Sequence, residues 1–347
     1  MLSPILAAFN IPEGLHSLQP FGNGLINHTW KIGYLGKMYI LQRINDRVFK
    51  DPFAIGENIE AIGQYLQEQA PSYLFVHPIK SRTGQTIVRD EQHGYFRLFP
   101  FIEGSHTIDV VATSAQAFEA AAQFGGFTKK LSGFNPAALR ITLPDFHNLA
   151  LRYRQFTGAV EKAGAYRKER SRILIEFLLS QEAIVHTWIE LQKNPAFIKR
   201  VTHHDTKISN VLFDPNDKGL CVIDLDTVMP GYFISDVGDM MRTYLSPVSE
   251  EEQDLSKISV RGDYFIAIVK GYLSEMEKEL STEEKKYFVH AGKFMIFMQA
   301  IRFLTDYLED DVYYGQQYEG HNFIRAGNQV CLLQKLAEKE AGLLTLI

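Results

Sequence analysis

The segment from His203 to Asp226 places acidic and amide side chains on both sides of an apolar, strand-like run. Asp205 and Asn210 lie five residues apart, and Asp224 and Asp226 follow at the end of that run. One carboxylate can orient an attacking hydroxyl group, while an amide and a second carboxylate can hold the divalent cation that bridges nucleotide phosphates. In that chemistry the protein contributes positioning and charge neutralisation. The segment therefore predicts phosphoryl transfer; the alternative is a capped turn followed by an ordinary strand end.

This pattern resembles the catalytic loop of the protein-kinase-like fold in its small-molecule branch, the aminoglycoside phosphotransferase and choline kinase family. His203, Asp205 and Asn210 match the order H-x-D-x-x-x-x-N, and residues 223–226 match I-D-[WLF]-[DE]. The resemblance implies an enzyme, an ATP-dependent phosphotransferase with an alcohol group as acceptor. In such an enzyme Asp205 would orient the hydroxyl group and take its proton. Asn210 and Asp224 would hold Mg²⁺.

Four polar residues near this loop have roles that the residue types leave open. Asp226 is a candidate ligand of a second metal ion or a candidate sugar contact. Lys207 would neutralise the transferred group, or would be an ordinary surface lysine. An aspartate at the position of Asp236 usually braces the catalytic loop in the family, so we expect a structural role there. Asp239 is a candidate helix-start residue.

The composition indicates a globular chain with enough residues for two hydrophobic cores. The chain has 347 residues, of which 46% are hydrophobic and 22% are charged, and its net charge is −5. We expect no nucleic-acid surface and no membrane patch, and the N-terminus carries no basic leader. Cys221 and Cys331 are interpreted as small buried hydrophobes, which fits a cytoplasmic protein. The family resemblance suggests a monomer.

The first hundred residues show an order of elements that is typical of a kinase-like small lobe. Two strands flank a turn at residues 35–36 and predict a hairpin, and a helix with Pro52 in its first turn follows. Two further strands are expected around the turn at residues 81–84, before an aromatic strand. The predicted strands are 29–34, 37–43, 76–79, 85–88 and 95–101, and the predicted helix is 51–69.

From residue 105 onward the pattern becomes helical, and Ser281 with Glu284 predicts a capping box. The predicted helices are 116–131, 169–193, 263–279, 283–308 and 323–341. We therefore expect an α+β, two-lobed protein-kinase-like fold. A small N-lobe with a mixed antiparallel sheet, residues 1–102, would bind the nucleotide. A larger, mainly helical C-lobe, residues 103–347, would carry the catalytic loop and the sugar site.

A nucleotide site is expected in the N-lobe. Gly22 and Gly24, with Asn23 between them, would let backbone amides approach the phosphates; the alternative is a plain hairpin turn. Phe101 and Glu103 lie in the segment whose backbone would pair with the adenine edge while aromatic and aliphatic side chains cover its faces.

Gln42 stands on the third strand, where the family generally carries a cation that touches the phosphates. A neutral amide cannot supply that charge, so either Gln42 hydrogen-bonds a phosphate or the charge falls more heavily on magnesium. Arg43 points to the opposite face if the strand alternates regularly. Glu57 and Glu60 on the following helix are candidates for a partner acid.

Longer runs resemble the N-acetylhexosamine 1-kinases within this family, and the resemblance extends from Gly22 to the last helix. The runs are 39–42, 101–103, 201–207, 223–231 and 302–309. The resemblance implies that ATP phosphorylates the anomeric hydroxyl of N-acetylglucosamine or N-acetylgalactosamine. A Gln at position 42 also recurs in that subgroup. Leu25 replaces a His that could reach the sugar, which leaves the identity of the sugar open.

Three residues are expected in the sugar pocket besides the catalytic aspartate: Arg302, Tyr313 and Thr227. Arg302 lies in an apolar helix, where a charged group needs a partner. The alternative for Arg302 is a structural ion pair with Asp306 or Glu309. Tyr313 would stack on the sugar or fill the core.

Two other functions stay open. The first is a kinase of another alcohol, such as an aminoglycoside or a choline-like compound, which would need a cluster of acids or an aromatic cage; the acids at residues 309–311 allow this. The second is a non-catalytic ATP-binding module, which Gln42 favours. The presence of Asp205, Asn210 and Asp224 together argues against that module.

Overall fold

The chain folds into two compact units in the computed structural model, which describes residues 2–14, 16–22 and 26–346. The first unit consists of Met1–Thr107, Lys130–Pro144 and Asn210–Pro230, and the second of Ile108–Lys129, Asp145–Ser209 and Gly231–Ile347. Asn210 and Asp224 therefore belong to the first unit, and Asp205 to the second. The predicted domain boundary between residues 102 and 103 stays a prediction.

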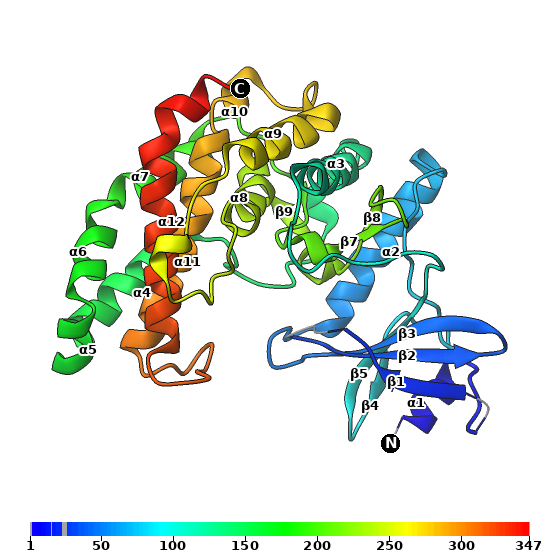
Figure 1. Cartoon of the computed structure of the whole chain (residues 1–347). Helices are drawn as coiled ribbons and strands as arrows, with labels where there is room; N and C mark the ends of the chain where they lie inside the picture. The colour runs from blue at the N-terminus through cyan, green and yellow to red at the C-terminus, as the bar shows by residue number, and fades with distance from the viewer. Residues whose placement is uncertain (1, 15, 23–25, 347) are drawn as a thin grey trace. The chain divides into compact units, whose positions relative to one another are not determined.

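Within the described residues, the first unit is built on a five-stranded antiparallel sheet with the order β1-β2-β3-β5-β4 (Figure 1). The predicted hairpin is confirmed, because β2 and β3 pair around residues 35–36. Helix α2 begins after Asp51, whose side chain accepts a hydrogen bond from the Ala54 amide. The elements are α1 (Ser3–Ala8), β1 (His16–Pro20), β2 (His28–Tyr34), β3 (Lys37–Ile44), α2 (Pro52–Gln69), β4 (Val88–Asp90), β5 (Gly94–Pro100), η1 (Pro136–Ala138), β7 (Val211–Phe213), β8 (Gly219–Val222), η3 (Leu225–Thr227) and β9 (Met229–Gly231).

The pleat gives this sheet two faces with different surroundings. Leu41 and Leu98 lie directly opposite each other on β3 and β5, and with Phe96 they form a core with the apolar side of α1. Residues alternate between faces along a strand. Gln42 and Arg97, which are also directly paired, therefore point to the face away from α1.

Two predicted strands of the first unit are wrong. Residues 76–79 are irregular, and residues 85–87 form no strand; β4 begins only at Val88. Pro78 explains the first error, because proline cannot donate to a strand ladder. Strand β1 was not predicted, since most of its residues are exposed and it lacks the apolar alternation that identifies a strand.

The second unit is mainly helical, as expected. Helix α11 is buried along most of its length and packs against α4, α8 and α12; Figure 1 shows α11 in orange beside α12 in red. The elements are α3 (Ser114–Lys130), α4 (Leu149–Lys162), α5 (Ala165–Arg170), α6 (Arg172–Ser180), α7 (Glu182–Lys193), β6 (Arg200–Thr202), η2 (Ile208–Asn210), α8 (Phe233–Tyr244), η4 (Leu255–Lys257), α9 (Gly262–Met276), α10 (Thr282–Lys285), α11 (Phe288–Leu308) and α12 (His321–Leu344).

Two of the predicted long helices are interrupted. The region predicted as one helix over 169–193 comprises α5, α6 and α7, which break at Ser171 and Gln181. The helix predicted over 283–308 comprises α10 and α11. Apolar periodicity does not detect a break of one or two residues, because the pattern continues across it. The capping box of Ser281 and Glu284 is confirmed, with both of its hydrogen bonds present.

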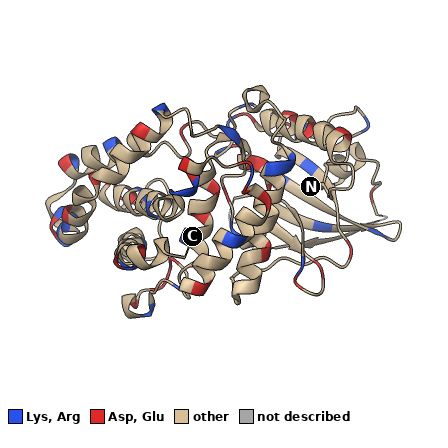
Figure 2. Cartoon of the chain, turned by 90° about the horizontal axis from the view of Figure 1, so that it is seen from above, with Lys and Arg blue, Asp and Glu red and all other residues tan. Residues whose placement is uncertain are grey.

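Charged residues of both signs are interspersed along the helices and strands, as Figure 2 shows in blue and red. In the described part of the chain, every helix is too short or too polar to cross a membrane.

Candidate functional site

A short hairpin in the first unit brings Asn210 and Asp224 to the same end of two paired strands. Val211 of β7 lies opposite Val222 of β8, and the Ile223 amide donates to the Asn210 carbonyl at 2.8 Å. Asp224 has φ 60° and ψ 60°, a left-handed conformation in which Asp is more common than most residues. The pairing of β7 with β8 thus places two of the predicted metal ligands, Asn210 and Asp224, close to each other.

Asp226 is held by two donors within the same unit. Its Oδ1 accepts from Arg97 Nη1, and its Oδ2 accepts from Asn27 Nδ2 at 2.8 Å. The two charged side chains are almost fully buried, with 1% of Arg97 and 3% of Asp226 exposed. The Asp226 carbonyl accepts from Thr142 Oγ1 at 2.7 Å. Both carboxylate oxygens are therefore engaged inside the unit, and a metal-binding role for Asp226 stays a prediction.

A pocket of about 190 Å³ opens on the sheet face away from α1. Ile40 and Phe99 line it from β3 and β5, and Leu212 and Val222 line it from the β7–β8 hairpin. At its polar part it is lined by three residues of the first unit: Gln42, Arg97 and Asp224. Flat apolar walls with a few polar groups on one side suit a planar base that carries phosphates.

The residues that are predicted to bind the nucleotide lie in different places in the first unit, and their roles stay predictions. Phe101 lines the pocket, and Lys31 Nζ lies 3.7 Å from the centre of its ring. Glu103 is exposed and is not among the described residues that line the pocket. Gly22 has φ 74°, which requires the conformational freedom of glycine. Asn23, Gly24 and Leu25 lie outside the described residues.

Gln42 hydrogen-bonds a neighbouring arginine. Its Oε1 accepts from Arg97 Nε at 3.0 Å, and its Nε2 donates to Thr29 Oγ1 at 3.4 Å. The two candidate partner acids on α2 have other partners. Glu57 accepts from Arg140 at 2.9 Å and Glu60 from Lys80 at 2.6 Å.

In the second unit, helix α8 uses Asp236 to brace the loop that is predicted to be catalytic, as expected. The Asp236 carboxylate accepts hydrogen bonds from the backbone amides of His203 at 3.1 Å and His204 at 2.7 Å. Gly238 lets α8 approach α11, because a Cβ there would lie 2.4 Å from the Ala291 carbonyl oxygen.

Asp239 lies inside α8, so its predicted place at a helix start is wrong. Its Oδ2 accepts from the Thr206 amide at 2.8 Å. Asp236 and Asp239 are one helical turn apart and therefore share the face of α8 that meets the loop. The Tyr244 hydroxyl donates to the Thr206 carbonyl at 2.5 Å. The loop backbone on both sides of Asp205 is thus fixed by α8.

Burial raises the pKa of the Asp236 carboxyl from 3.8 to about 7, although the two backbone amides favour its charged form. The folded protein therefore binds a proton that the unfolded chain has released. The contribution of this proton to the free energy of unfolding is fully present below about pH 4 and is lost as the pH rises to about 7. Its size is on the order of 4 kcal/mol.

We therefore expect Asp236→Asn to remove one component of the pH dependence of stability. Urea unfolding of both proteins at several pH values between about 4.5 and 7.5 measures it. Wild-type stability should fall relative to that of the variant as the pH rises, by up to about 4 kcal/mol. Taking the difference cancels the titration of the histidines. A difference that stays constant with pH would contradict the raised pKa.

Asp205 and Lys207 lie close to each other in the second unit. Lys207 Nζ is 3.3 Å from Asp205 Oδ2, and 22% of the Asp205 side chain is exposed. A partly exposed carboxylate on a rigid backbone can meet a small molecule without a change in the loop. That Asp205 faces Asn210 and Asp224 stays a prediction.

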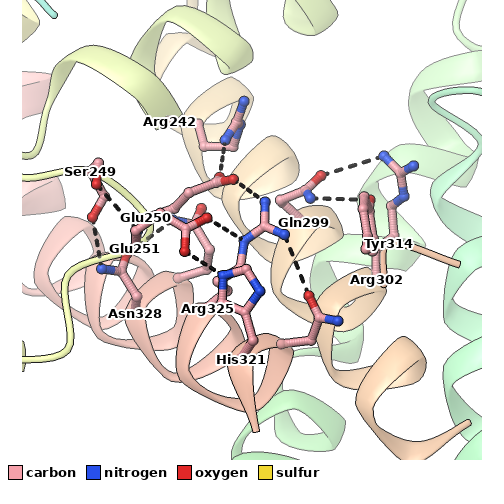
Figure 3. A network of polar contacts seen from close by, with 12 residues as sticks. Arg242, Ser249, Glu250, Glu251, Gln299, Arg302, Tyr314, His321, Arg325 and Asn328 are labelled. Carbon is pink, nitrogen blue, oxygen red and sulfur yellow. Dashed lines mark hydrogen bonds and ion pairs between the residues drawn. The ribbon is translucent and has the colours of Figure 1, made fainter. Parts of the chain in front are cut away.

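Arg302 and Tyr313, predicted to contact the substrate, lie together. Arg302 Nη2 is 3.5 Å from the Tyr313 hydroxyl, and its Nη1 is 3.4 Å from Gln299 Oε1. Its guanidinium also faces the rings of Tyr314 and Phe146, at 5.4 and 5.9 Å from their centres. Figure 3 shows Arg302, Gln299 and Tyr314 in one hydrogen-bonded group. Thr227 is buried in the first unit, and its place in a shared sugar pocket stays a prediction.

The alternative role of Arg302, a structural ion pair with Asp306 or Glu309, is not found among the described contacts. The Asp306 carboxylate accepts from the backbone amides of Tyr313 at 2.6 Å and Tyr314 at 2.9 Å, and from Asn322 at 3.0 Å. Asp306 therefore fixes the segment that carries Tyr313. The described hydrogen-bond partners of Arg302 are neutral.

His147, which the sequence did not single out, lies between the surroundings of Arg302 and the loop that carries Asp205. His147 Nδ1 lies 2.8 Å from Ser235 Oγ and 3.2 Å from His204 Nδ1. Burial lowers the pKa of His147 well below its ordinary value, and the charges of His204, Arg302 and Arg152 lower it further. Arg152 and Arg302 thus act on a histidine that touches the loop next to Asp205.

A second polar network surrounds α12. Arg325 pairs with Glu250, and Glu250 also accepts from Arg242 at 2.7 Å. Figure 3 shows Arg242, Glu250 and Arg325 of this network. Arg242 Nε also donates to Asp239 at 3.0 Å, so the network reaches the residue that accepts from the Thr206 amide.

Comparison with known proteins identifies relatives of this arrangement. A family model described as "APH: Phosphotransferase enzyme family" matches residues 17–261. The fold resembles an aminoglycoside phosphotransferase from Alicyclobacillus acidocaldarius subsp. acidocaldarius, with a TM-score of 0.66 and 13% identity over 97% of this chain and 94% of that chain. It also resembles a microcompartment-associated aminopropanol kinase (TM-score 0.67, 15% identity, 98% and 97% covered). A third similar structure is amicoumacin kinase hAmiN, solved with AMP-PNP and Ca²⁺ (TM-score 0.62, 13% identity, 92% and 88% covered). The predicted α+β protein-kinase-like fold is thereby confirmed.

Proposed function

The chain belongs to the phosphotransferase enzyme family, and we propose that it phosphorylates the anomeric hydroxyl of N-acetylhexosamines with ATP. The products would be the sugar 1-phosphate and ADP. The anomeric oxygen forms a bond to the γ-phosphorus, and the bond between that phosphorus and the β,γ-bridging oxygen breaks. The hydroxyl proton goes to Asp205.

The charge of the pocket beside Arg302 is the observation that carries the choice of substrate. Among the described residues, four basic and two acidic side chains line this pocket: Arg152, Arg154, Lys162, Arg302, Asp306 and Glu309. Burial and the neighbouring Arg302 charge lower the pKa of Arg152. Because like charges repel, this pocket opposes a cationic aminoglycoside or choline-like substrate and tolerates an uncharged, hydroxyl-rich one.

The aromatic rings in the same region could bind a cationic substrate only if no protein cation already occupied their faces. The rings of Tyr313 and Tyr314 already face the Arg302 guanidinium, at 5.9 and 5.4 Å from their centres. A second cation would have to displace Arg302. Arg302 and Tyr313 instead offer a donor and a hydroxyl group to a sugar.

The first unit supports the ATP part of the proposal. Its pocket joins apolar walls to Gln42, Arg97 and Asp224. Asn210 and Asp224 offer amide and carboxylate oxygens, the donors that Mg²⁺ takes in proteins together with phosphate oxygens. These two residues would therefore hold Mg²⁺, which when bound neutralises charge on the phosphates.

The catalytic step depends on the position and basicity of Asp205. The anomeric hydroxyl is more acidic than an ordinary alcohol, so a carboxylate suffices as proton acceptor late in a loose transition state. Lys207, 3.3 Å from that carboxylate, would stabilise negative charge on the transferred group. The rigid backbone around Asp205, held by α8, would keep the hydroxyl aligned.

A substrate panel tests the proposal. Purified protein is incubated with ATP, Mg²⁺ and one acceptor: N-acetylglucosamine, N-acetylgalactosamine, glucose, kanamycin, choline or 1-amino-2-propanol. ADP release gives the rate, and ³¹P NMR gives the phosphorylated position. We expect turnover of the N-acetylhexosamines at the anomeric oxygen and none of the three cationic alcohols, kanamycin, choline and 1-amino-2-propanol. Preferential phosphorylation of a hydroxyl group of one of these cationic alcohols would contradict the proposal.

A further inference from the structure

Arg97 occupies an unusual position for a charged residue. It lies in an aromatic strand, only 1% of its surface is exposed, and it still lines the nucleotide pocket. We propose that Arg97 supplies, from β5, the positive charge for the nucleotide phosphates that neutral Gln42 cannot supply from β3, with Asp226 as its counterion. The inference rests on the ATP site of the proposed function.

The register of the sheet puts the two residues side by side. Gln42 pairs directly with Arg97 on β5 and with Thr29 on β2, so all three side chains lie on one face of the sheet. Arg97 Nε donates to Gln42 Oε1 at 3.0 Å, and Gln42 Nε2 donates to Thr29 Oγ1 at 3.4 Å. The cation on β5 therefore lies one strand, about 5 Å, from the position on β3 where the family generally carries its cation.

Stability alone does not account for this pair. A buried ion pair often makes the folded protein no more stable than apolar residues of the same volume would, and removing one partner is strongly destabilising. The same pocket wall already contains Ile40 and Phe99, which are directly paired beside Gln42 and Arg97. A second apolar pair, in place of Gln42 and Arg97, would continue that wall. A guanidinium there is better explained by an anionic ligand, which Arg can bind with several donors.

The charges near the pocket support this assignment. Arg97 carries +1, and Asp226 and Asp224 carry −1 each, so the three together carry −1. Without Arg97, the two remaining carboxylates carry −2 and repel a polyphosphate more strongly. Asn27 Nδ2 and Arg97 Nη1 engage the two Asp226 oxygens. That arrangement fits a counterion that orients Arg97, in place of the second-metal or sugar role expected for Asp226.

The test moves the positive charge from β5 to β3. The variant Arg97→Gln removes the charge, and the double variant Arg97→Gln with Gln42→Lys restores it on β3. A second double variant, Arg97→Gln with Asp226→Asn, removes both charges of the ion pair. Arg89→Gln, at the exposed middle position of β4, is the matched control. Binding of fluorescent mant-ADP is titrated without metal, and thermal unfolding verifies that each variant is folded.

We expect Arg97→Gln to weaken mant-ADP binding by about tenfold or more, since hydrogen bonds to charged groups contribute about 1.5–3 kcal/mol. The variant with Lys at position 42 should recover most of that loss, and Arg89→Gln should bind as wild type does. The variant that lacks both charges should fold like wild type and still bind weakly. It also gives the answer if Arg97→Gln alone does not fold.

Normal mant-ADP binding by the variant that lacks both charges would overturn the inference, because Arg97 would then serve only Asp226. That result leaves the proposed function intact. A wild-type protein that binds no mant-ADP at all would overturn both. In steady-state kinetics, the KM for ATP should rise in Arg97→Gln while the KM for the sugar stays close to that of wild type.

Discussion

Asp205→Asn should abolish sugar phosphorylation and leave nucleotide binding in place. An amide has nearly the same shape as a carboxylate but cannot accept the hydroxyl proton, and a positioned base contributes about 10²–10⁴-fold to the rate. The loop should keep its structure, because the carboxylates of Asp236 and Asp239 hold the backbone on either side. We expect kcat to fall by about 10³-fold or more with little change in the melting temperature.

The control is Asp263→Asn, which makes the same chemical change at an exposed position in the first turn of α9. It should retain wild-type turnover. Titration with mant-ADP separates catalysis from binding, and Asp205→Asn should bind it as wild type does. Full turnover by Asp205→Asn would show that another group orients the acceptor, and would favour a different catalytic residue. Inactive wild-type protein would favour the non-catalytic ATP-binding module.

The parts of the site that the sequence predicts are those that depend on short spacings. Asn210 and Asp224 flank one hairpin of two short strands, so their types and separation nearly define their relative position. The capping box at Ser281 could be expected for the same reason, because a few residues of chain decide its geometry. The bracing role of Asp236 joins residues 32 and 33 positions apart, and only the family resemblance indicated it.

The parts that the sequence does not predict depend on contacts between distant segments. Arg97 and Asp226 are separated by 129 positions, and periodicity gives no information about such a pair. One local signal was present: a charged residue stands at an alternate position of an aromatic strand, opposite Gln42. The pairing of β3 with β5 converts that signal into a contact, and strand register cannot be derived from one sequence.

The same limit applies to the pocket beside Arg302. The helical pattern of α11 predicts that Arg302 needs a partner, but it does not indicate which one. Folding brings α4 close enough for the charge of Arg302 to lower the pKa of Arg152. Asp306, the nearer acid in sequence, is used by the backbone of residues 313–314. Local spacing therefore left an ion pair open as an alternative for Arg302, in a region where the fold forms a basic pocket.

The ion pair of Arg200 and Glu284 should give the largest single effect on stability. Arg200 Nη1 and Nη2 lie 2.6 and 2.9 Å from the two Glu284 oxygens, and the Glu284 side chain is fully buried. Glu284→Gln keeps the size of the side chain and its capacity to cap α10, but leaves the Arg200 charge without its partner. Breaking a buried pair in this way costs about 3–5 kcal/mol.

Urea unfolding at constant pH measures this loss. The matched control is Glu283→Gln, at a half-buried position of α10 where Glu283 pairs with the exposed Lys286, and it is expected to change stability by less than about 1 kcal/mol. The double variant Arg200→Met with Glu284→Leu removes both charges and should recover much of the loss. Recovery assigns the cost of Glu284→Gln to an uncompensated charge. If the double variant is as unstable as the single one, the loss arises instead from the backbone groups that the pair satisfies, the carbonyls of Ile198 and Glu279 and the amide of Ser281.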